Sequence, residues 1–209
     1  MKNLFYSFAL LCRKAFYKAD SRFFIAVNDA LSIVIIISIL AIIFDSVSEF
    51  AQYHQFFLSV EYIAVLIFSV EYVCRIVGSP KKLSYIFSFF GLIDLISILP
   101  TWFHLVNLTP LKSARALRIL RFLRTLRLAK VTRLERLDKY SVADTSSVIR
   151  LNLKIYFLAF MFVVLILGNL VYIFEHNHPG FSNIPLSMLL ALEAVLGGSI
   201  SNITPQTYA

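Results

Sequence analysis

Long, nearly unbroken runs of apolar residues alternate with short polar segments along this chain of 209 residues. At about 1.5 Å of rise per residue, a helix of about 20 residues crosses the roughly 30 Å hydrocarbon core of a bilayer. Runs that reach this length with their flanks lie at residues 30–44, 56–77, 85–103 and 151–174. We therefore expect each of them to form a membrane-spanning helix.

Residues 1–19 show a different pattern, with apolar residues at helical spacing and basic residues on the other faces. Such a helix lies in the membrane interface rather than across the bilayer. A secretory signal peptide is the competing interpretation. The apolar stretch is short, however, Arg13 and Lys14 follow it directly, and there is no cleavage site of small residues. We expect an interfacial amphipathic helix.

A repeat of basic residues occupies one further candidate span, RALRILRFLRTLRLAKVTRLERL at residues 115–137. On an α-helix, positions three apart step back by about 60°, so the charges trace a spiral, whereas a 3₁₀ helix would align them in one stripe. A spiral suits a helix that is surrounded by protein and water. We define the basic repeat as Arg115, Arg118, Arg121, Arg124, Arg127, Lys130, Arg133 and Arg136.

The composition agrees with a membrane protein, since 59% of the residues are hydrophobic and only 15% are charged. The net charge of +8 belongs largely to the basic repeat. The residues between these charges are apolar, so we expect no nucleic acid as a partner. The sequence has no phosphate loop, Ser/His/Asp arrangement or zinc spacing, and we expect neither an enzyme nor a cofactor or metal site. Cys12 and Cys74 are expected to be reduced packing residues.

The loops differ in Lys and Arg content, which sets the orientation of membrane helices. The N-terminal segment, the loop with Lys81 and Lys82 and the segment after the basic repeat are basic, whereas residues 50–55 and 104–110 carry no Lys or Arg. This alternation predicts a cytoplasmic N-terminus and a basic repeat that itself crosses the membrane.

Acidic residues inside the spans offer counter-charges for the basic repeat. Each Arg or Lys at the bilayer centre costs about 2.5–3.5 kcal/mol, so burying several of them requires partners. Glu61 and Glu71 lie about 15 Å apart along one helix and within about 80° of each other, and Asp94 lies in the next span. We expect Glu61 and Glu71 to form an outer and an inner station, with Phe68 sealing the gap between them.

Static salt bridges that hold the bundle together are the alternative hypothesis, and Glu71 with Arg75 could be a local pair of residues i and i+4. These acids do not balance the basic residues of the span, however, and static pairs do not need a repeat. We therefore favour a role in sensing voltage, because moving one charge through the field is worth about 2.3 kcal/mol per 100 mV.

The segments VEYIAVLIFSVEYVCRIVGSP at residues 60–80 and GLIDLISILP at 91–100, followed by the basic repeat, resemble the voltage-sensor domain of the voltage-gated cation channels. The likeness is greatest to the bacterial-type potassium channels. It implies that Phe68 and Glu71 form the gating-charge transfer centre, with Asp94 as its second acid.

The resemblance also implies a role for each end of the basic repeat. Arg115 to Arg127 are the charges expected to move, whereas Lys130 is expected to begin at or beyond the inner station. Glu61 corresponds to the outer acid of the family.

The last part of the chain resembles a potassium-channel pore. LNLKIYFLAFMFVVLILGNLVYIFE at residues 151–175 is similar to the outer helix, and FSNIPLSMLLALEAVL at 181–196 is similar to the descending pore helix. Within the latter, Glu193 is either a pore acid or a structural hydrogen-bonding partner, and we favour the structural role.

The filter departs from the family pattern. Where the family has Thr-Val-Gly-Tyr-Gly, this sequence has Gly197, Gly198, Ser199, Ile200 and Ser201. A potassium filter needs inward-pointing backbone carbonyls, and Gly takes the required backbone geometry at little cost. We therefore do not assign potassium selectivity. No apolar span follows before Ala209, so we expect a sensor with part of a pore, either as a fragment or as a subunit of this length.

We therefore predict an all-α membrane protein, with a four-helix voltage-sensor bundle followed by a pore outer helix and a re-entrant pore helix. The predicted units are an interfacial helix at residues 1–23, a voltage-sensor domain at 24–132, a linker helix at 133–149 and a partial pore domain at 150–209.

The predicted function is that of a voltage-gated, potassium-channel-like cation channel subunit in the plasma membrane or a bacterial inner membrane. Its expected partners are the lipid bilayer, monovalent cations and either three further copies in a homotetramer or a complete channel subunit. A non-conducting regulatory subunit is the alternative, and a proton-permeable sensor with Asp45 as the acid is a weaker one.

Overall fold

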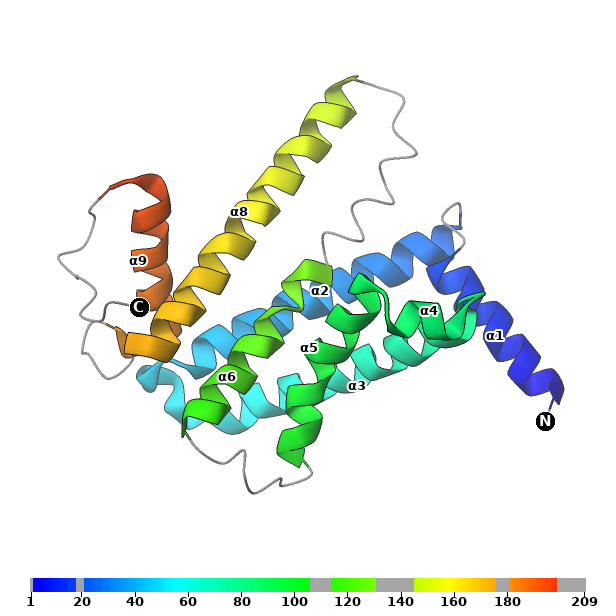
Figure 1. The fold of residues 1–209 in the computed structure, drawn as a ribbon, viewed down its shortest axis with the longest axis horizontal. Coiled ribbons are helices and arrows are strands. Elements are labelled where there is room, and N and C mark those ends of the chain that lie inside the picture. Colours follow the sequence, from blue (N-terminus) through cyan, green and yellow to red (C-terminus); the bar gives the residue numbers. More distant parts are fainter. Residues whose placement is uncertain (1, 18–20, 106–113, 131–144, 176–180, 199–209) are drawn as a thin grey trace.

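A computed structural model describes residues 2–17, 21–105, 114–130, 145–175 and 181–198. These residues form helices and contain no strand, which confirms the predicted all-α fold. Figure 1 shows their arrangement. The helices are α1 (Lys2–Phe16), α2 (Arg22–Asp45), the 3₁₀ helix η1 (Ser48–Tyr53), α3 (His54–Gly78), α4 (Lys82–Ile86), α5 (Phe89–Leu105), α6 (Ala114–Thr125), α8 (Thr145–Glu175) and α9 (Ile184–Leu196).

The centre of the fold is a bundle of α2, α3, α5 and α6, in which each helix contacts two of the others (Figure 1). A buried core joins Ile35 of α2, Phe68 of α3 and Ile98 of α5. Other apolar side chains of α2 and α3, such as Ile33 and Ile63, lie exposed on the outside of the bundle. A hydrophobic outside is what a helix bundle presents to lipid.

Among the described residues, three helical segments are long and apolar enough to cross a membrane, namely Arg22–Asp45, Ser48–Gly78 and Ile155–Glu175. Phe89–Phe103 and Ile184–Leu196 are apolar but shorter. Three of the runs predicted to span therefore occur as long helices, while the run at residues 85–103 is divided between two helices.

That division occurs because the chain turns back on itself between α4 and α5. A Cβ atom on Gly91 would lie 1.9 Å from the carbonyl oxygen of Tyr85, so only glycine permits this approach. The turn places the Tyr85 hydroxyl on the carboxylate of Asp94, to which it donates a hydrogen bond. The turn between α4 and α5 therefore orients the carboxylate of Asp94.

Helices α8 and α9 lie side by side next to the bundle (Figure 1). A Cβ atom on Gly168 of α8 would lie 2.7 Å from the Cα atom of Met188, so glycine lets the two helices approach closely. The side chain of Asn183 caps α9 by accepting a hydrogen bond from the Leu186 amide at 3.0 Å. Gly197 ends α9 with a φ of 68°, a left-handed conformation that favours glycine.

The start of α8 bears on the predicted boundary between linker and pore at residue 150. Residues 145–149 belong to the same helix as the predicted outer helix of the pore. Most of the predicted linker, residues 133–144, lies outside the described part of the chain. Helix α9 also contacts the bundle. The Ile184 amide donates a hydrogen bond to the Ser46 hydroxyl at the end of α2, at 3.0 Å.

Candidate functional site: two charge stations on helix α3

Helix α3 positions two carboxylates and an aromatic ring inside the bundle. Glu61, Phe68 and Glu71 are all buried, and the ring of Phe68 has no exposed surface. Phe68 follows Glu61 by seven residues, about two helical turns, and therefore lies on nearly the same face of α3. We call the groups around Glu61 the Glu61 station and those around Glu71 the Glu71 station.

The Glu61 station holds Arg127, whose side chain is fully buried. Its Nη2 and Nη1 atoms lie 2.6 Å and 3.1 Å from the two carboxylate oxygens of Glu61, which is a bidentate contact. The Nε atom of Arg127 donates to the carbonyl oxygen of Ser97 at 3.1 Å, and the Thr101 hydroxyl donates to Glu61 at 2.7 Å. The buried guanidinium is therefore matched in both charge and geometry.

The next basic residue toward the N-terminus lies at the edge of the same station. The Nε atom of Arg124 is 3.7 Å from the nearer Glu61 oxygen, and its side chain is 15% exposed. Arg124, Glu61 and Asp45 also line one narrow pocket. Asp45 itself lies 2.6 Å from the ring nitrogen Nδ1 of His54. Asp45 at the end of α2 therefore lies near the Glu61 station.

The Glu71 station holds Lys130 between two acids. The Nζ atom of Lys130 lies 3.4 Å from Oε2 of Glu71 and 3.2 Å from Oδ1 of Asp94. Arg75 occupies the other oxygen of Glu71, with Nη2 at 2.7 Å and Nε at 2.8 Å from Oε1. Glu71 therefore divides its two oxygens between one cation of its own helix and one cation of the basic repeat.

The ring of Phe68 lies between the two stations and contacts a cation on each side. The ring centroid is 5.4 Å from the guanidinium carbon of Arg127 and 4.6 Å from the Nζ atom of Lys130. Both distances lie within the range of cation–π attraction. The ring itself is fully buried.

The backbone around these cations includes a turn between two α-helical segments. The amide of Arg127 bonds to the carbonyl of Arg124 at 3.2 Å, and that of Lys130 bonds to the carbonyl of Arg127 at 2.9 Å. These are i to i−3 hydrogen bonds, and they form the turn at residues 126–127 that separates α6 from the α-helical residues 128–130. From this turn Arg127 and Lys130 both reach carboxylates of α3.

The structure brings together seven of the residues singled out from the sequence, and their roles stay predictions. Arg115, Arg118 and Arg121 belong to α6, but the described side chains do not include them. Ser199, Ile200 and Ser201 also lie outside the described residues, whereas Gly197 and Gly198 are exposed at the end of α9. The residues brought together are Glu61, Phe68, Glu71, Asp94, Arg124, Arg127 and Lys130.

The sequence prediction missed several groups that complete the stations. Ser97 and Thr101 follow Asp94 by three and seven residues, so a polar stripe on an otherwise apolar helix was a usable signal. Tyr85 gave no such signal, because its contact with Asp94 depends on the turn between α4 and α5. A local pair of Glu71 with Arg75 belonged to the alternative of static salt bridges, and the two side chains are in contact.

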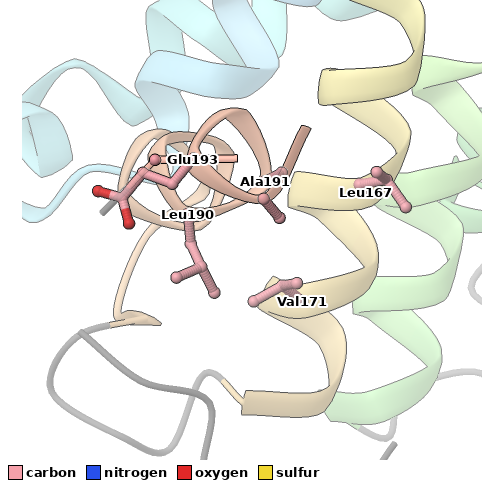
Figure 2. Close-up of a pocket in the computed structure, with 7 residues that line it drawn as sticks. Leu167, Val171, Leu190, Ala191 and Glu193 are labelled. Carbon is pink, nitrogen blue, oxygen red and sulfur yellow. The ribbon is translucent and has the colours of Figure 1, made fainter. Parts of the chain in front are cut away.

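A separate pocket of about 380 Å³ lies between α8 and α9. Figure 2 shows Leu167 and Val171 of α8 on one side and Leu190 and Ala191 of α9 on the other. Glu193 is buried at its edge, and in this view its carboxylate points away from α8. The lining is otherwise apolar, so this pocket offers packing surface rather than a polar binding site.

Comparison with known proteins places this geometry in a family. The profile of the family described as ion transport protein matches residues 27–209, nearly the whole chain. No individual curated protein matches the sequence. The match covers the bundle with its two charge stations as well as α8 and α9. The chain is therefore an integral membrane protein and belongs to the ion transport protein family, within the voltage-gated ion channel superfamily.

Proposed function

We propose that this chain is a voltage-sensing subunit of a cation channel, potassium-channel-like in descent. One observation carries the proposal: Arg127 and Lys130, three residues apart, occupy two carboxylate stations on opposite sides of one buried aromatic ring. A shift of the basic repeat by three residues would bring Arg127 to Glu71 and Arg124 to Glu61. Each departing cation is then replaced by the next, so no carboxylate is left without a partner.

This exchange would be driven by the membrane potential. In the proposed orientation the N-terminus is cytoplasmic, α3 runs inward, and the Glu61 station is the outer one. The arrangement with Lys130 at Glu71 is then the outward position of the basic repeat, which depolarisation favours. One shift by three residues carries one charge past Phe68 and would contribute about 2.3 kcal/mol at 100 mV, and four successive shifts would contribute about 9 kcal/mol per subunit.

The output of the sensor would be the pore. Helix α8 follows the basic repeat in the chain and also contacts α6 directly, so motion of the repeat has two mechanical routes to α8. We propose that α8 and α9 contribute the outer helix and the pore helix of a central pore for monovalent cations, assembled from four subunits. Monovalent cations and the lipid bilayer are then its partners.

Recording from the purified protein in planar bilayers tests the function. We expect charge movement that saturates with voltage and an ionic current under a potassium or sodium gradient that follows it. The double substitution of Arg124 and Arg127 by Gln should reduce the charge moved per subunit by about two elementary charges, whereas replacing the exposed Glu49 by Gln should leave it unchanged. Absence of voltage-dependent charge movement in the unmodified protein would overturn the proposal.

A second candidate is a subunit that senses voltage without conducting. Ser199 and Ser201 favour it, because they stand where potassium channels have the glycines of the filter. The same recordings separate the two candidates. Charge movement without any ionic current, together with co-purification of a channel that has an intact filter, would support the non-conducting subunit. Current through the purified chain alone would exclude it.

A further inference from the structure

Helix α1 packs directly on the end of α3 that carries the Glu71 station. The ring of Phe16 lies 4.6 Å from the guanidinium carbon of Arg75, and the Tyr17 hydroxyl donates to the carbonyl oxygen of Arg75 at 2.8 Å. A Cβ atom on Gly78 would lie 3.1 Å from the Tyr17 ring, so the helices approach closely. Arg75 is thereby held between Phe16 of α1 and Glu71 of its own helix.

The same contact brings the two cysteines of the chain together. Cys12 lies one turn before Phe16 on α1, and Cys74 immediately precedes Arg75 on α3. Both thiols are free and buried, with Cys12 fully covered, and they lie within hydrogen-bonding reach of each other. The sequence spacing had suggested two separate packing residues. Their proximity in the fold makes a dithiol instead.

We propose that Cys12 and Cys74 form a redox site at which a small hydroperoxide produces a disulfide, and that this bond fastens α1 to the Glu71 station. The effect on voltage sensing rests on the function proposed above, whereas the disulfide itself does not. Burial of both thiols excludes large oxidants, so the oxidant is taken to be hydrogen peroxide.

The chemistry requires two steps. The sulfur of one deprotonated cysteine attacks the peroxide, the O–O bond breaks, and a sulfenic acid and hydroxide form. The second thiolate then attacks that sulfur, the S–S bond forms, and the S–O bond breaks to release a second hydroxide. With the two protons from the thiols, the balance is two thiols and one H₂O₂ giving one disulfide and two waters, with both sulfurs oxidised and the peroxide reduced.

The bond would act on the stations through Arg75. A locked α1 keeps Phe16 over Arg75, and Arg75 in turn keeps one oxygen of Glu71 occupied. Lys130 is a compact point charge that needs only the remaining oxygen, whereas an arginine binds best through both oxygens. Oxidation therefore favours Lys130 over Arg127 at the Glu71 station. In the proposed orientation this shifts the midpoint of charge movement toward negative voltages.

The first part of the test detects the bond itself. The full chain in lipid vesicles is treated with hydrogen peroxide or with dithiothreitol, alkylated and digested, and the peptides are identified by mass spectrometry. We expect an intramolecular link between Cys12 and Cys74 that dithiothreitol reverses. Recovery of both cysteines as alkylated thiols after peroxide, or only links between chains, would overturn the redox site.

The second part measures charge movement of the same protein before and after oxidation. We expect the equilibrium between the two positions of the repeat to change by roughly fivefold or more, a coupling of the size seen between linked sites. C12S and C74S should be insensitive to peroxide. If charge movement is normal and its midpoint voltage is the same in the reduced and the oxidised protein, the link between the disulfide and voltage sensing is overturned. Absence of charge movement in the reduced protein would instead overturn the proposed function, while the mass spectra still decide the redox site.

Discussion

At the residue scale, Glu61 joins three elements of the bundle through one carboxylate. It lies on α3, accepts a hydrogen bond from Thr101 of α5, and receives both terminal nitrogens of Arg127. Removing one partner of a buried ion pair is costly, because it leaves the other charge without compensation. The stability of the bundle should therefore depend strongly on this one residue.

Substitution of Glu61 by Gln tests this dependence. The change keeps the size and most hydrogen-bonding groups but removes the charge that compensates Arg127. We expect unfolding in detergent to require about 3–5 kcal/mol less free energy, measured by thermal and denaturant unfolding. The matched control is the exposed Glu49 changed to Gln, with an expected effect within about 0.5 kcal/mol. Equal stability of the two variants would contradict a structural charge pair at Glu61.

Phe68 allows a prediction about the path between the stations. Its ring contacts the Nζ atom of Lys130 more closely than the guanidinium of Arg127. Trp offers a stronger cation–π partner and Leu offers none. We expect F68W to stabilise Lys130 at the Glu71 station by about 0.5–2 kcal/mol and F68L to destabilise it there. The midpoint voltage of charge movement should therefore shift in opposite directions in the two variants. Shifts of the same sign would show that ring size, not cation attraction, matters.

At the element scale, the turn between α4 and α5 decides where Asp94 can act. The turn depends on Gly91, because a side chain there would meet the Tyr85 carbonyl. Without this close approach the Tyr85 hydroxyl would not reach Asp94, and one acid of the Glu71 station would lose its orientation. Gly91 therefore determines the orientation of Asp94, although it lies far from the basic repeat in the sequence.

Substitution of Gly91 by Ala should be disruptive although it adds only one methyl group. We expect a loss of about 3 kcal/mol or more in the free energy of unfolding, since the backbone itself must move to make room. The neighbouring Leu92, which is 42% exposed, changed to Ala provides the control and should change stability far less. Thermal unfolding in detergent measures both, and a wild-type-like G91A would contradict the tight turn.

Also at this scale, a turn interrupts the described part of the basic repeat. Residues 114–125 form the α-helix α6, residues 126–127 form a turn with i to i−3 bonds, and residues 128–130 are α-helical again. The turn lies between the cation of the Glu61 station and that of the Glu71 station, which are three residues apart.

At the scale of the whole molecule, the proposed motion makes Arg124 change its surroundings. Arg124 lines a narrow pocket with Glu61 and Asp45 at one end of the bundle. In the position described here it is on the far side of Phe68 from the Glu71 station. A shift of the repeat by three residues would move it from the edge of the Glu61 station into the fully buried place that Arg127 now occupies.

Replacing Arg124 by Cys in a C12S/C74S background tests this motion. We expect a charged, membrane-impermeant thiol reagent on the external side to react readily at depolarised voltages. At hyperpolarised voltages the reaction should be at least about tenfold slower, because moving a few charges through the field readily shifts the equilibrium by that factor. Cys in place of Ile33, which is 58% exposed on the outside of the bundle, should stay unreactive because lipid covers it. A rate independent of voltage would contradict the motion.

The sequence by itself determined the helical membrane fold, the charge repeat and the acids that face it. These features are local: the length of an apolar run decides whether a helix crosses a bilayer, and the spacing of charges decides which face they share. The placement of Lys130 at or beyond the inner station came from the resemblance to voltage sensors, and in the structure Lys130 lies 3.4 Å from Glu71, while its role stays a prediction. The division of the run at residues 85–103 was not predicted, because it depends on the close contact at Gly91.

Only the tertiary structure decided how the charges pair and what α1 does. The partner of each cation depends on how far one helix is displaced along another, and a shift of three residues changes every pair while leaving the pattern of the sequence intact. For the same reason Cys12 and Cys74, far apart in the chain, revealed no relation until α1 was packed on α3. Long-range contacts of this kind arise from packing and from the balance of buried charges, which no local pattern of residues encodes.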